Sequence, residues 1–293
     1  MKVLNFGSCN IDYVYSLDHI VRPGETTEAH SVSKYPGGKG LNQSVALARS
    51  CTEVYHAGCV GADGEMLRDV LTQSGVNTDY IKEVAEPTGQ AIIQVEKSGE
   101  NCIFLYHGAN FCVSKEYIDE VLGNFSAGDI LLVQNEINNL PYLVEKGAEK
   151  GLKMVLNPSP FNDVIKEVDL AKVWCLILNK TESEGFAEKD FLEIMKEKYP
   201  EMHIMLTLGK EGSVYQYKEI FVKCPAYSVK AVDTTAAGDT FTGFFISGFA
   251  GGDGAEEAVR YASAAAALAV SKNGAASSIP KHAEVLEFIK NHA

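Results

Sequence analysis

The chain of 293 residues lacks the patterns that mark several large classes of protein. Its seven cysteines include no C-x-x-C pair, and no cluster of cysteine and histidine has the spacing of a zinc site. Lysine and arginine form no basic cluster and the formal net charge is −13, so neither nucleic acid nor an anionic membrane is an expected partner. No apolar run reaches the length of a membrane span, and the first seven residues are too short and too polar for a signal peptide. We expect a cytoplasmic protein whose cysteines stay reduced.

Two common nucleotide-binding fingerprints are also absent. In the segment Pro36-Gly-Gly-Lys-Gly40 the lysine is followed by glycine, so the Walker A spacing G-x-x-x-x-G-K-[ST] is not met. After its first predicted strand the chain reads Gly7-Ser-Cys-Asn10, which is not the G-x-G-x-x-G turn of a dinucleotide site. Neither fingerprint explains the glycines of these segments.

The chain does contain short β-rich runs that alternate with amphipathic helical patterns. This alternation predicts an α/β fold with three layers, in which a mostly parallel central sheet lies between helices. After Gly212 two short β-rich runs predict an antiparallel hairpin, and two or three helices end the chain. The predicted strands are residues 2–6, 54–59, 130–134, 153–156, 174–178, 203–208, 213–217 and 220–222, and the predicted helices include residues 42–50, 65–74, 115–122, 140–150, 189–198 and 283–290.

Two stretches, at about residues 12–36 and 88–107, interrupt this alternation. Both have the residue pattern of extended chain, and neither contains a crossover helix of its own. We expect them to pair as a small β-sheet lid inserted into a single domain that spans residues 1–293. The alternative is a pair of edge hairpins with no moving part.

The run Asp233-Thr-Thr-Ala-Ala-Gly-Asp239 leads directly into an apolar helical segment. The first N–H groups of a helix have no partner within the helix and attract anions, so Ala236, Ala237 and Gly238 could form an anion hole. The carboxylate of Asp239 at that place suggests a general base that takes a proton from a hydroxyl while the N–H groups stabilise phosphoryl charge. The alternative is an Asp that only caps the helix.

Polar residues also stand just beyond several predicted strands, where ligands bind in open α/β sheets. Each of them alone could simply be a turn residue, since Asn, Asp and Gly are common in turns. Together with Asp239, however, they would converge on one edge of the sheet. A second group comes from the glycine-rich turn before the first helix, where Lys39 and Asn42 can donate hydrogen bonds. The residues beyond the strands are Asn10, Asp12, Glu136, Asn157, Asn179, Glu182 and Gly209.

Two segments of the chain resemble, in the correct order, the two signatures of the ribokinase-like (PfkB) carbohydrate kinase family. They are Gly37-Gly-Lys-Gly-Leu-Asn-Gln43 and Asp233-Thr-Thr-Ala-Ala-Gly-Asp239, and the likeness continues nearly end to end. The resemblance implies the ribokinase-like fold and phosphoryl transfer from ATP to a small sugar, with the 5-hydroxyl of D-ribose as the first choice. Alternative substrates are deoxyribose, another free sugar or a nucleoside. A further alternative is a sugar-binding protein that has lost its activity. Tyr13, Tyr15, Phe104 and Tyr106 keep stacking on a nucleoside open.

The resemblance also implies a role for each matching residue. Asp239 would be the catalytic base, with Ala236, Ala237 and Gly238 as its anion hole. Phe104 and Tyr106 are bulkier than the resemblance leads us to expect. The resemblance also implies a homodimer that forms through the apolar side chains within residues 92–95 and 103–105 of the lid. The implied sugar ligands are Asn10, Asp12, Gly38, Lys39, Asn42, Glu136 and Asp239; the ATP ligands are Asn179, Thr207, Gly209, Gly212 and Gly238; the Mg²⁺ that accompanies ATP is held through water by Glu182; and activating K⁺ is held near Asp233, Thr235, Ala269, Lys272, Gly274 and Ser278.

Overall fold

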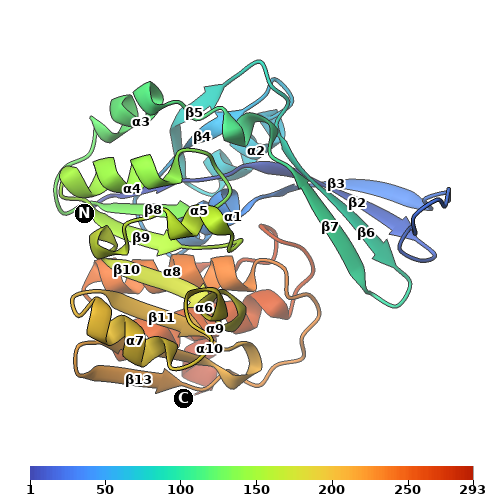
Figure 1. The fold of residues 1–293 in the computed structure, drawn as a ribbon. Coiled ribbons are helices and arrows are strands. Elements are labelled where there is room, and N and C mark those ends of the chain that lie inside the picture. Colours follow the sequence, from blue (N-terminus) through green and yellow to red (C-terminus); the bar gives the residue numbers. More distant parts are fainter. Residues whose placement is uncertain (293) are drawn as a thin grey trace.

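The computed structural model describes residues 1–292 and contains two separate sheets (Figure 1). The larger has nine strands in the order β13-β12-β11-β10-β9-β8-β1-β4-β5. Seven of its strands are parallel, while β12 and β13 form an antiparallel hairpin at one edge. This confirms the predicted mostly parallel sheet and the hairpin. The bounds are β1 Val3–Phe6, β4 Val54–Val60, β5 Asn77–Glu83, β8 Ile130–Gln134, β9 Lys153–Asn157, β10 Cys175–Asn179, β11 His203–Thr207, β12 Ser213–Tyr217 and β13 Ile220–Cys224.

Helices cover both faces of this sheet, as the alternation of strands and helices predicts (Figure 1). Successive side chains of a strand point to opposite faces, and Val3 of β1 accordingly joins one apolar core while Leu4 joins the other. Within residues 1–292 no helix combines the length and apolar character needed to cross a bilayer. The first face carries α1 Lys39–Arg49, α2 Glu65–Gln73, α8 Ala237–Gly251, α9 Ala255–Val270 and α10 His282–Asn291, and the second carries α3 Lys115–Leu122, α4 Leu140–Glu149, α5 Asp163–Lys166, α6 Lys180–Phe186 and α7 Phe191–Lys198.

Two elements, one at the sheet edge and one beside the later cavity-lining residues, escaped the sequence prediction. Strand β5 pairs only with β4 at the sheet edge, and Ile81 is its one buried residue, so it lacks the apolar run of an inner strand. Helix α6 follows β10 without a loop, because Asn179 caps it and Glu182 completes a capping box.

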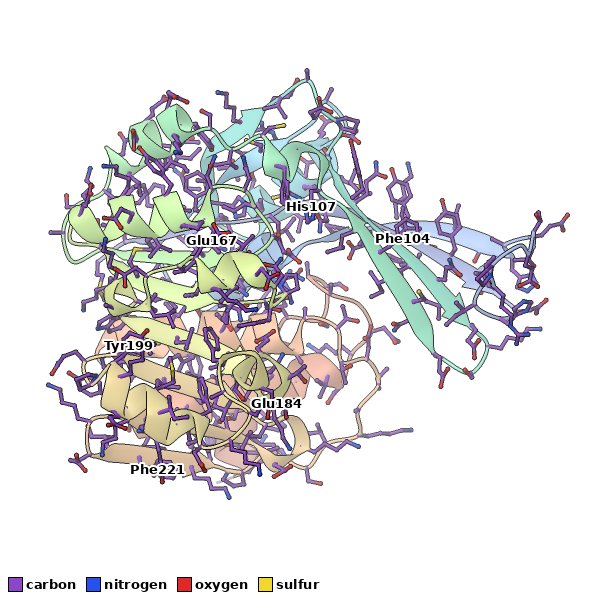
Figure 2. The ribbon with its side chains drawn as sticks, viewed as in Figure 1. Phe104, His107, Glu167, Glu184, Tyr199 and Phe221 are labelled. Carbon is purple, nitrogen blue, oxygen red and sulfur yellow. The ribbon has the colours of Figure 1, made fainter. Side chains whose placement is uncertain are left out.

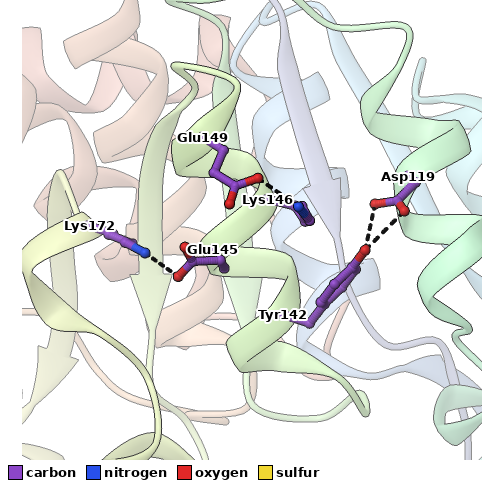
Figure 3. Close-up of polar contacts among 6 residues, drawn as sticks. All are labelled: Asp119, Tyr142, Glu145, Lys146, Glu149 and Lys172. Atoms are coloured by element: carbon purple, nitrogen blue, oxygen red, sulfur yellow. Dashed lines mark hydrogen bonds and ion pairs between the residues drawn. The ribbon is translucent and has the colours of Figure 1, made fainter.

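Exposed polar contacts join α4 to its neighbours (Figure 3). The hydroxyl of Tyr142 donates to both carboxylate oxygens of Asp119 on α3, at 3.0 and 2.9 Å, and Lys172 pairs with Glu145. Contacts of this exposed kind typically contribute less than about 1 kcal/mol each. The buried apolar side chains beneath α4 therefore hold this layer.

The smaller sheet projects from the body of the molecule in the order β3-β2-β6-β7 (Figure 1). It is built from β2 Asn10–Leu17, β3 Ser31–Gly37, β6 Gly89–Glu96 and β7 Asn101–Tyr106, all within or beside the two stretches predicted as extended. We call it the second sheet. Strand β7 ends at Tyr106, and His107 stacks on Phe111 where the chain re-enters the body (Figure 2).

The two faces of the second sheet carry different residues. Asp12 is paired with Ala91, and Ala91 with Leu105, so these three side chains share one face. Phe104 precedes Leu105 on β7, so its side chain lies on the opposite face of the sheet. Figure 2 shows Phe104 on this projecting strand. Tyr13, Tyr15 and Tyr106 lie on the same face as Phe104. The bulk of Phe104 and Tyr106 therefore does not fall on the face of Asp12.

We expect Gly243→Ala to lower the free energy of unfolding by about 1–3 kcal/mol, because α8 packs directly against α1. A Cβ at residue 243 would lie 2.4 Å from Ala46 Cβ and 2.9 Å from the nitrogen of Leu47. Gly251→Ala, on the same helix, is the control, since no atom lies within 4 Å of its added Cβ. It should leave stability unchanged or raise it. Urea unfolding measures both variants, and equal losses would contradict the close packing.

Candidate active site

A cavity of about 240 Å³ lies where the carboxyl ends of β9, β10 and β11 face the start of α8. Its position agrees with the rule that ligands bind beyond the carboxyl ends of parallel strands. Many of the polar residues that the sequence singles out line it, from segments far apart in the chain. The lining residues are Lys39, Asn157, Ser159, Ile177, Leu178, Asn179, Glu182, Thr207, Thr234, Ala236, Ala237, Gly238, Asp239 and Thr242.

Asp239 is buried in this cavity, with 8% of its surface exposed. Two amides from α1 hold its carboxylate: Asn42 Nδ2 donates to Oδ2 at 3.2 Å, and Gln43 Nε2 donates to Oδ1 at 2.9 Å. The Oδ1 atom of Asn42 is buried and has no hydrogen-bond partner among residues 1–292. A buried acceptor of this kind is expected to find a donor, such as a ligand hydroxyl.

Two further carboxylates lie close together beside α1. Glu136 Oε2 accepts from the hydroxyl of Ser8 at 2.5 Å and from the backbone N–H of Lys39 at 3.0 Å. Burial raises the pKa of Asp12 to about 7, and the negative charge of Glu136 adds to the shift. Burial also raises the pKa of Glu136, although Lys39 opposes it. Desolvated carboxylates of this kind are strong acceptors for hydroxyl groups.

Lys39 provides positive charge among these acids. Burial works to lower the pKa of its ammonium group, but the carboxylates of Asp239, Glu136 and Glu182 outweigh burial and raise it. The lysine is therefore charged at neutral pH and compensates part of the negative charge of the site.

The start of α8 has the unpaired N–H groups expected of an anion hole. Ala236 adopts the left-handed conformation with φ 58°, a strained geometry for a residue with a Cβ. The N–H of Ala237 donates to the carbonyl of Thr234 at 3.2 Å. Among residues 1–292 the N–H groups of Ala236 and Gly238 have no backbone partner. Two of the three predicted amides are thus available, while that of Ala237 closes a turn.

The residues predicted for the nucleotide and magnesium lie on the other side of the cavity. Asn179 Oδ1 accepts from the N–H of Glu182 at 2.9 Å, and Glu182 Oε2 accepts from the N–H of Asn179 at 3.0 Å. These contacts give both residues a structural role at the start of α6, and both also line the cavity. Thr207 lines it at the end of β11, whereas Gly209 and Gly212 lie in the following turn, outside the lining.

The loop predicted for potassium is held together by Asp233. Its Oδ1 accepts from the N–H and hydroxyl of Thr235 at 2.9 and 2.6 Å, and its Oδ2 accepts from the N–H of Gly274 at 2.9 Å. Burial opposes the charge of Asp233, but these hydrogen bonds outweigh it and lower the pKa. Ser278 donates to the carbonyl of Ala275 at 2.8 Å.

Arg49 on α1 orients the end of this loop. Its Nη1 donates to the carbonyls of Ala276 and Ile279, at 2.8 and 2.6 Å. The loop of the predicted cation site is therefore tied to the helix that carries Lys39, Asn42 and Gln43.

The structure brings Lys39, Asn179, Glu182, Thr207 and Asp239 together around one cavity, and Asn42 reaches it through Asp239. Asn10 and Asp12 on β2 and Glu136, two residues after β8, lie beside it. Sequence reasoning missed residues that act through others: Gln43 supports Asp239, Ser8 supports Glu136, and Asn110 donates to Asn10 Oδ1 at 2.7 Å. Of these residues, only Gln43 could have been suspected from the sequence, because it lies in the glycine-rich segment that resembles a family signature.

The family model for pfkB carbohydrate kinases matches residues 1–282. The chain belongs to the pfkB family of carbohydrate kinases. It is similar to the ribokinase of Haemophilus influenzae, with 36% identity over 299 residues and 97% of each chain covered. Its structure is similar to that of ribokinase from Thermotoga maritima, with a TM-score of 0.88, 35% identity and 99% of both chains covered. It is also similar to Arabidopsis thaliana ribokinase complexed with ribose and ATP, with a TM-score of 0.87, 28% identity, and 99% of this chain and 98% of that one covered. The kinase is thus a phosphotransferase that acts on a sugar hydroxyl.

The raised pKa of Asp12 predicts how the stability of the kinase varies with pH. Between the ordinary value of 3.8 and about 7, the folded protein binds more protons at Asp12 than the unfolded chain does. The contribution of Asp12 to the free energy of unfolding therefore falls as the pH rises through this interval. Asp12→Asn cannot ionise and removes this loss.

We expect Asp12→Asn to be more stable than the wild type at pH 8 by a larger margin than at pH 5. Urea unfolding of both proteins at the two pH values measures the margin. Asp79→Asn, on the exposed edge strand β5, is the control and should show no such change. A margin for Asp12→Asn that is equal at the two pH values would contradict the desolvation of Asp12.

Proposed function

We propose that the kinase is an ATP-dependent ribokinase that phosphorylates the 5-hydroxyl of D-ribose. The observation that carries this proposal is the buried carboxylate of Asp239 at the start of α8. Two amides of α1 hold it, and it lies next to unpaired helix N–H groups. The names of the similar proteins, one of them complexed with ribose and ATP, support ribose as the sugar.

In the proposed reaction Asp239 accepts the proton of the sugar hydroxyl. The oxygen forms a bond to the γ-phosphorus of ATP, and the bond between that phosphorus and the bridging oxygen breaks, so that the electron pair leaves on ADP. The N–H of Gly238 and the ammonium of Lys39 would stabilise charge on the transferring group. Asn10, Asp12, Asn42 and Glu136 would bind the sugar hydroxyls, with Gly38 allowing close approach.

Magnesium is proposed to accompany ATP near Glu182. When bound, it would neutralise phosphate charge. Carboxylate oxygen suits Mg²⁺, which usually keeps several waters. No group of three His, Cys, Asp or Glu side chains within residues 1–292 is placed to hold a metal ion. This donor set fits an ion bound mainly by phosphate and water, with Glu182 acting through water. Asn179, Thr207, Gly209 and Gly212 would surround the nucleotide.

The geometry of the second sheet favours a free sugar over a nucleoside. Tyr13, Tyr15, Phe104 and Tyr106 were the candidates for stacking on a base, and all four lie on the face opposite Asp12. The face of Asp12 instead carries small and aliphatic side chains at Ala91 and Leu105. A coupled assay with ribose, deoxyribose, hexoses and nucleosides tests the substrate. We expect the highest kcat/KM for ribose, and a preference for any nucleoside would overturn the proposal.

We also propose that the second sheet is a lid on the single domain 1–293 and joins two chains in a homodimer. Ile103 and Phe104 on β7 are 52% and 56% exposed, which is unusual for apolar residues of an edge strand. Sedimentation equilibrium that finds only monomer at micromolar concentration would exclude the dimer. The seven free cysteines support a reducing compartment, which we propose is the cytoplasm.

We expect Asp239→Asn to lower kcat by about 10²–10⁴-fold, since the variant loses its general base. Folding and ribose binding should persist because an amide keeps the size of the side chain. Single-turnover kinetics and ribose titration measure the two effects. Asp253→Asn, an exposed residue beyond the end of α8, is the control. A folded Asp239→Asn protein with the kcat of the wild type would contradict the proposed role of Asp239 as the general base.

Potassium is proposed to activate the kinase. Asp233, the backbone near Thr235, Ala269, Lys272 and Gly274, and Ser278 offer hard oxygen atoms that suit this ion. Since Asp233 joins both segments of the loop, an ion there would order the residues that lead into the anion hole. We expect potassium to support higher activity than sodium at equal ionic strength, and Asp233→Ala to remove most of the difference. Identical titrations with the two ions would exclude the site.

A further inference from the structure

Gln43, which supports Asp239, is completely buried. It lies on α1 next to Asn42. Its Nε2 donates two hydrogen bonds, to Asp239 Oδ1 at 2.9 Å and to Asn157 Oδ1 at 2.9 Å. Its Oε1 accepts from Gln134 Nε2 at 2.7 Å. Every polar atom of this side chain is therefore used.

The hydrogen bonds continue from α1 to β8 and β1 as a chain of side-chain amides. Gln134 Nε2 also donates to Asn5 Oδ1 at 2.9 Å, and Asn5 Nδ2 donates to the carbonyl of Gly40 at 2.7 Å. A carboxylate can only accept, so the NH₂ group of Gln43 must point to Asp239 and its oxygen to Gln134. The charge at one end thus fixes the direction of the chain and polarises it.

This chain joins the base to the strand that carries a sugar ligand. Gln134 ends β8, and Glu136 follows it by two residues. Through Gln43, the carboxylate of Asp239 is fixed relative to Glu136, although the two residues are far apart in sequence. Without Gln43, the side chain of Asn42 would hold the carboxylate only through Oδ2, at 3.2 Å, and the carboxylate could rotate about this single longer contact.

We propose that Gln43 is a positioning residue. It orients the Asp239 carboxylate toward the bound hydroxyl and fixes the position of the base relative to the sugar site. This rests on the proposed role of Asp239 as the base. The charged groups around the pair are Lys39, Glu136 and Glu182, with Asp12 next to Glu136. Gln43 adds no charge to this crowded group, whereas a lysine or a glutamate in its place would change the balance.

The first test is Gln43→Met, which keeps the length of the side chain and removes the donors. A displacement of about 1 Å at a reacting group can lower the rate on the order of 10²-fold. We expect kcat to fall by about 10–100-fold while KM for ATP stays within about threefold. Gln216→Met, a buried glutamine on β12 whose Nε2 donates only weakly, to the carbonyl of Leu192 at 3.4 Å, is the matched control and should keep the kcat of the wild type. A folded Gln43→Met protein with unchanged kcat would overturn the proposal.

The second test is Gln43→Glu, which places two carboxylates in contact. Such a pair shares a proton over an extended pH range. We expect the acid limb of the pH profile of kcat/KM to move upward by about one pH unit, because the added carboxylate would raise the pKa of the base that it contacts. An unshifted limb counts against the proposal. If Gln43→Met does not fold, Gln134→Met is used in its place, since it removes the donor to Gln43, and the same loss of kcat is expected.

A double-mutant cycle separates this inference from the proposed function. If Gln43 acts through Asp239, then Gln43→Met should lower the residual kcat of Asp239→Asn by less than about threefold, although it lowers that of the wild type far more. Equal losses in both backgrounds would refute the positioning role alone. An Asp239→Asn protein with the activity of the wild type would instead refute the base.

Discussion

The site depends on the close approach of four carboxylates at one edge of the sheet. Asp12, Glu136, Glu182 and Asp239 come from segments spread over most of the chain, and Lys39 offsets part of their charge. Burial raises the pKa of Asp12 and Glu136 because ionised carboxylates lose hydration there. Hydroxyl donors of a bound sugar would replace the missing water. The desolvation of these carboxylates lowers the stability of the free protein, and a sugar bound at the proposed site would offset part of this cost.

Uncharged hydrogen-bond donors hold the carboxylates of this cluster in place. A second lysine near Asp239 would compete for the phosphates, while amides and hydroxyls hold the carboxylates without adding charge. Ser8 holds Glu136, and Asn42 and Gln43 hold Asp239. A buried amide network stabilises a fold only when its members find partners. Among residues 1–292 the buried Oδ1 of Asn42, beside Asp239, has none, so a ligand hydroxyl bound there would complete its hydrogen bonds.

The residue pattern predicted the central sheet well because its inner strands are buried on both faces. It failed at β5, where one edge of the strand and most of its side chains face solvent, and at α6, which begins directly where β10 ends. The sequence also pointed to Asp239. Alone it could have been a helix cap, but together with the polar residues beyond the strands and the two family signatures it indicated a general base. It did not reveal Gln43 or which face of the second sheet Phe104 occupies. Both depend on contacts between distant segments, which no local pattern records.

The two glycine-containing signatures act together because α1 and α8 pack on each other. Gly243 brings α8 within contact of Ala46, and the hydrogen bonds from Asn42 and Gln43 to Asp239 cross the same interface. This rigid pairing also explains why the strained conformation of Ala236 can persist at the start of α8. The apolar interface stabilises the helix as a whole, so its first turn can keep unpaired N–H groups and a left-handed residue. The same packing that stabilises the fold therefore holds Asp239, the proposed base, against the amides of α1.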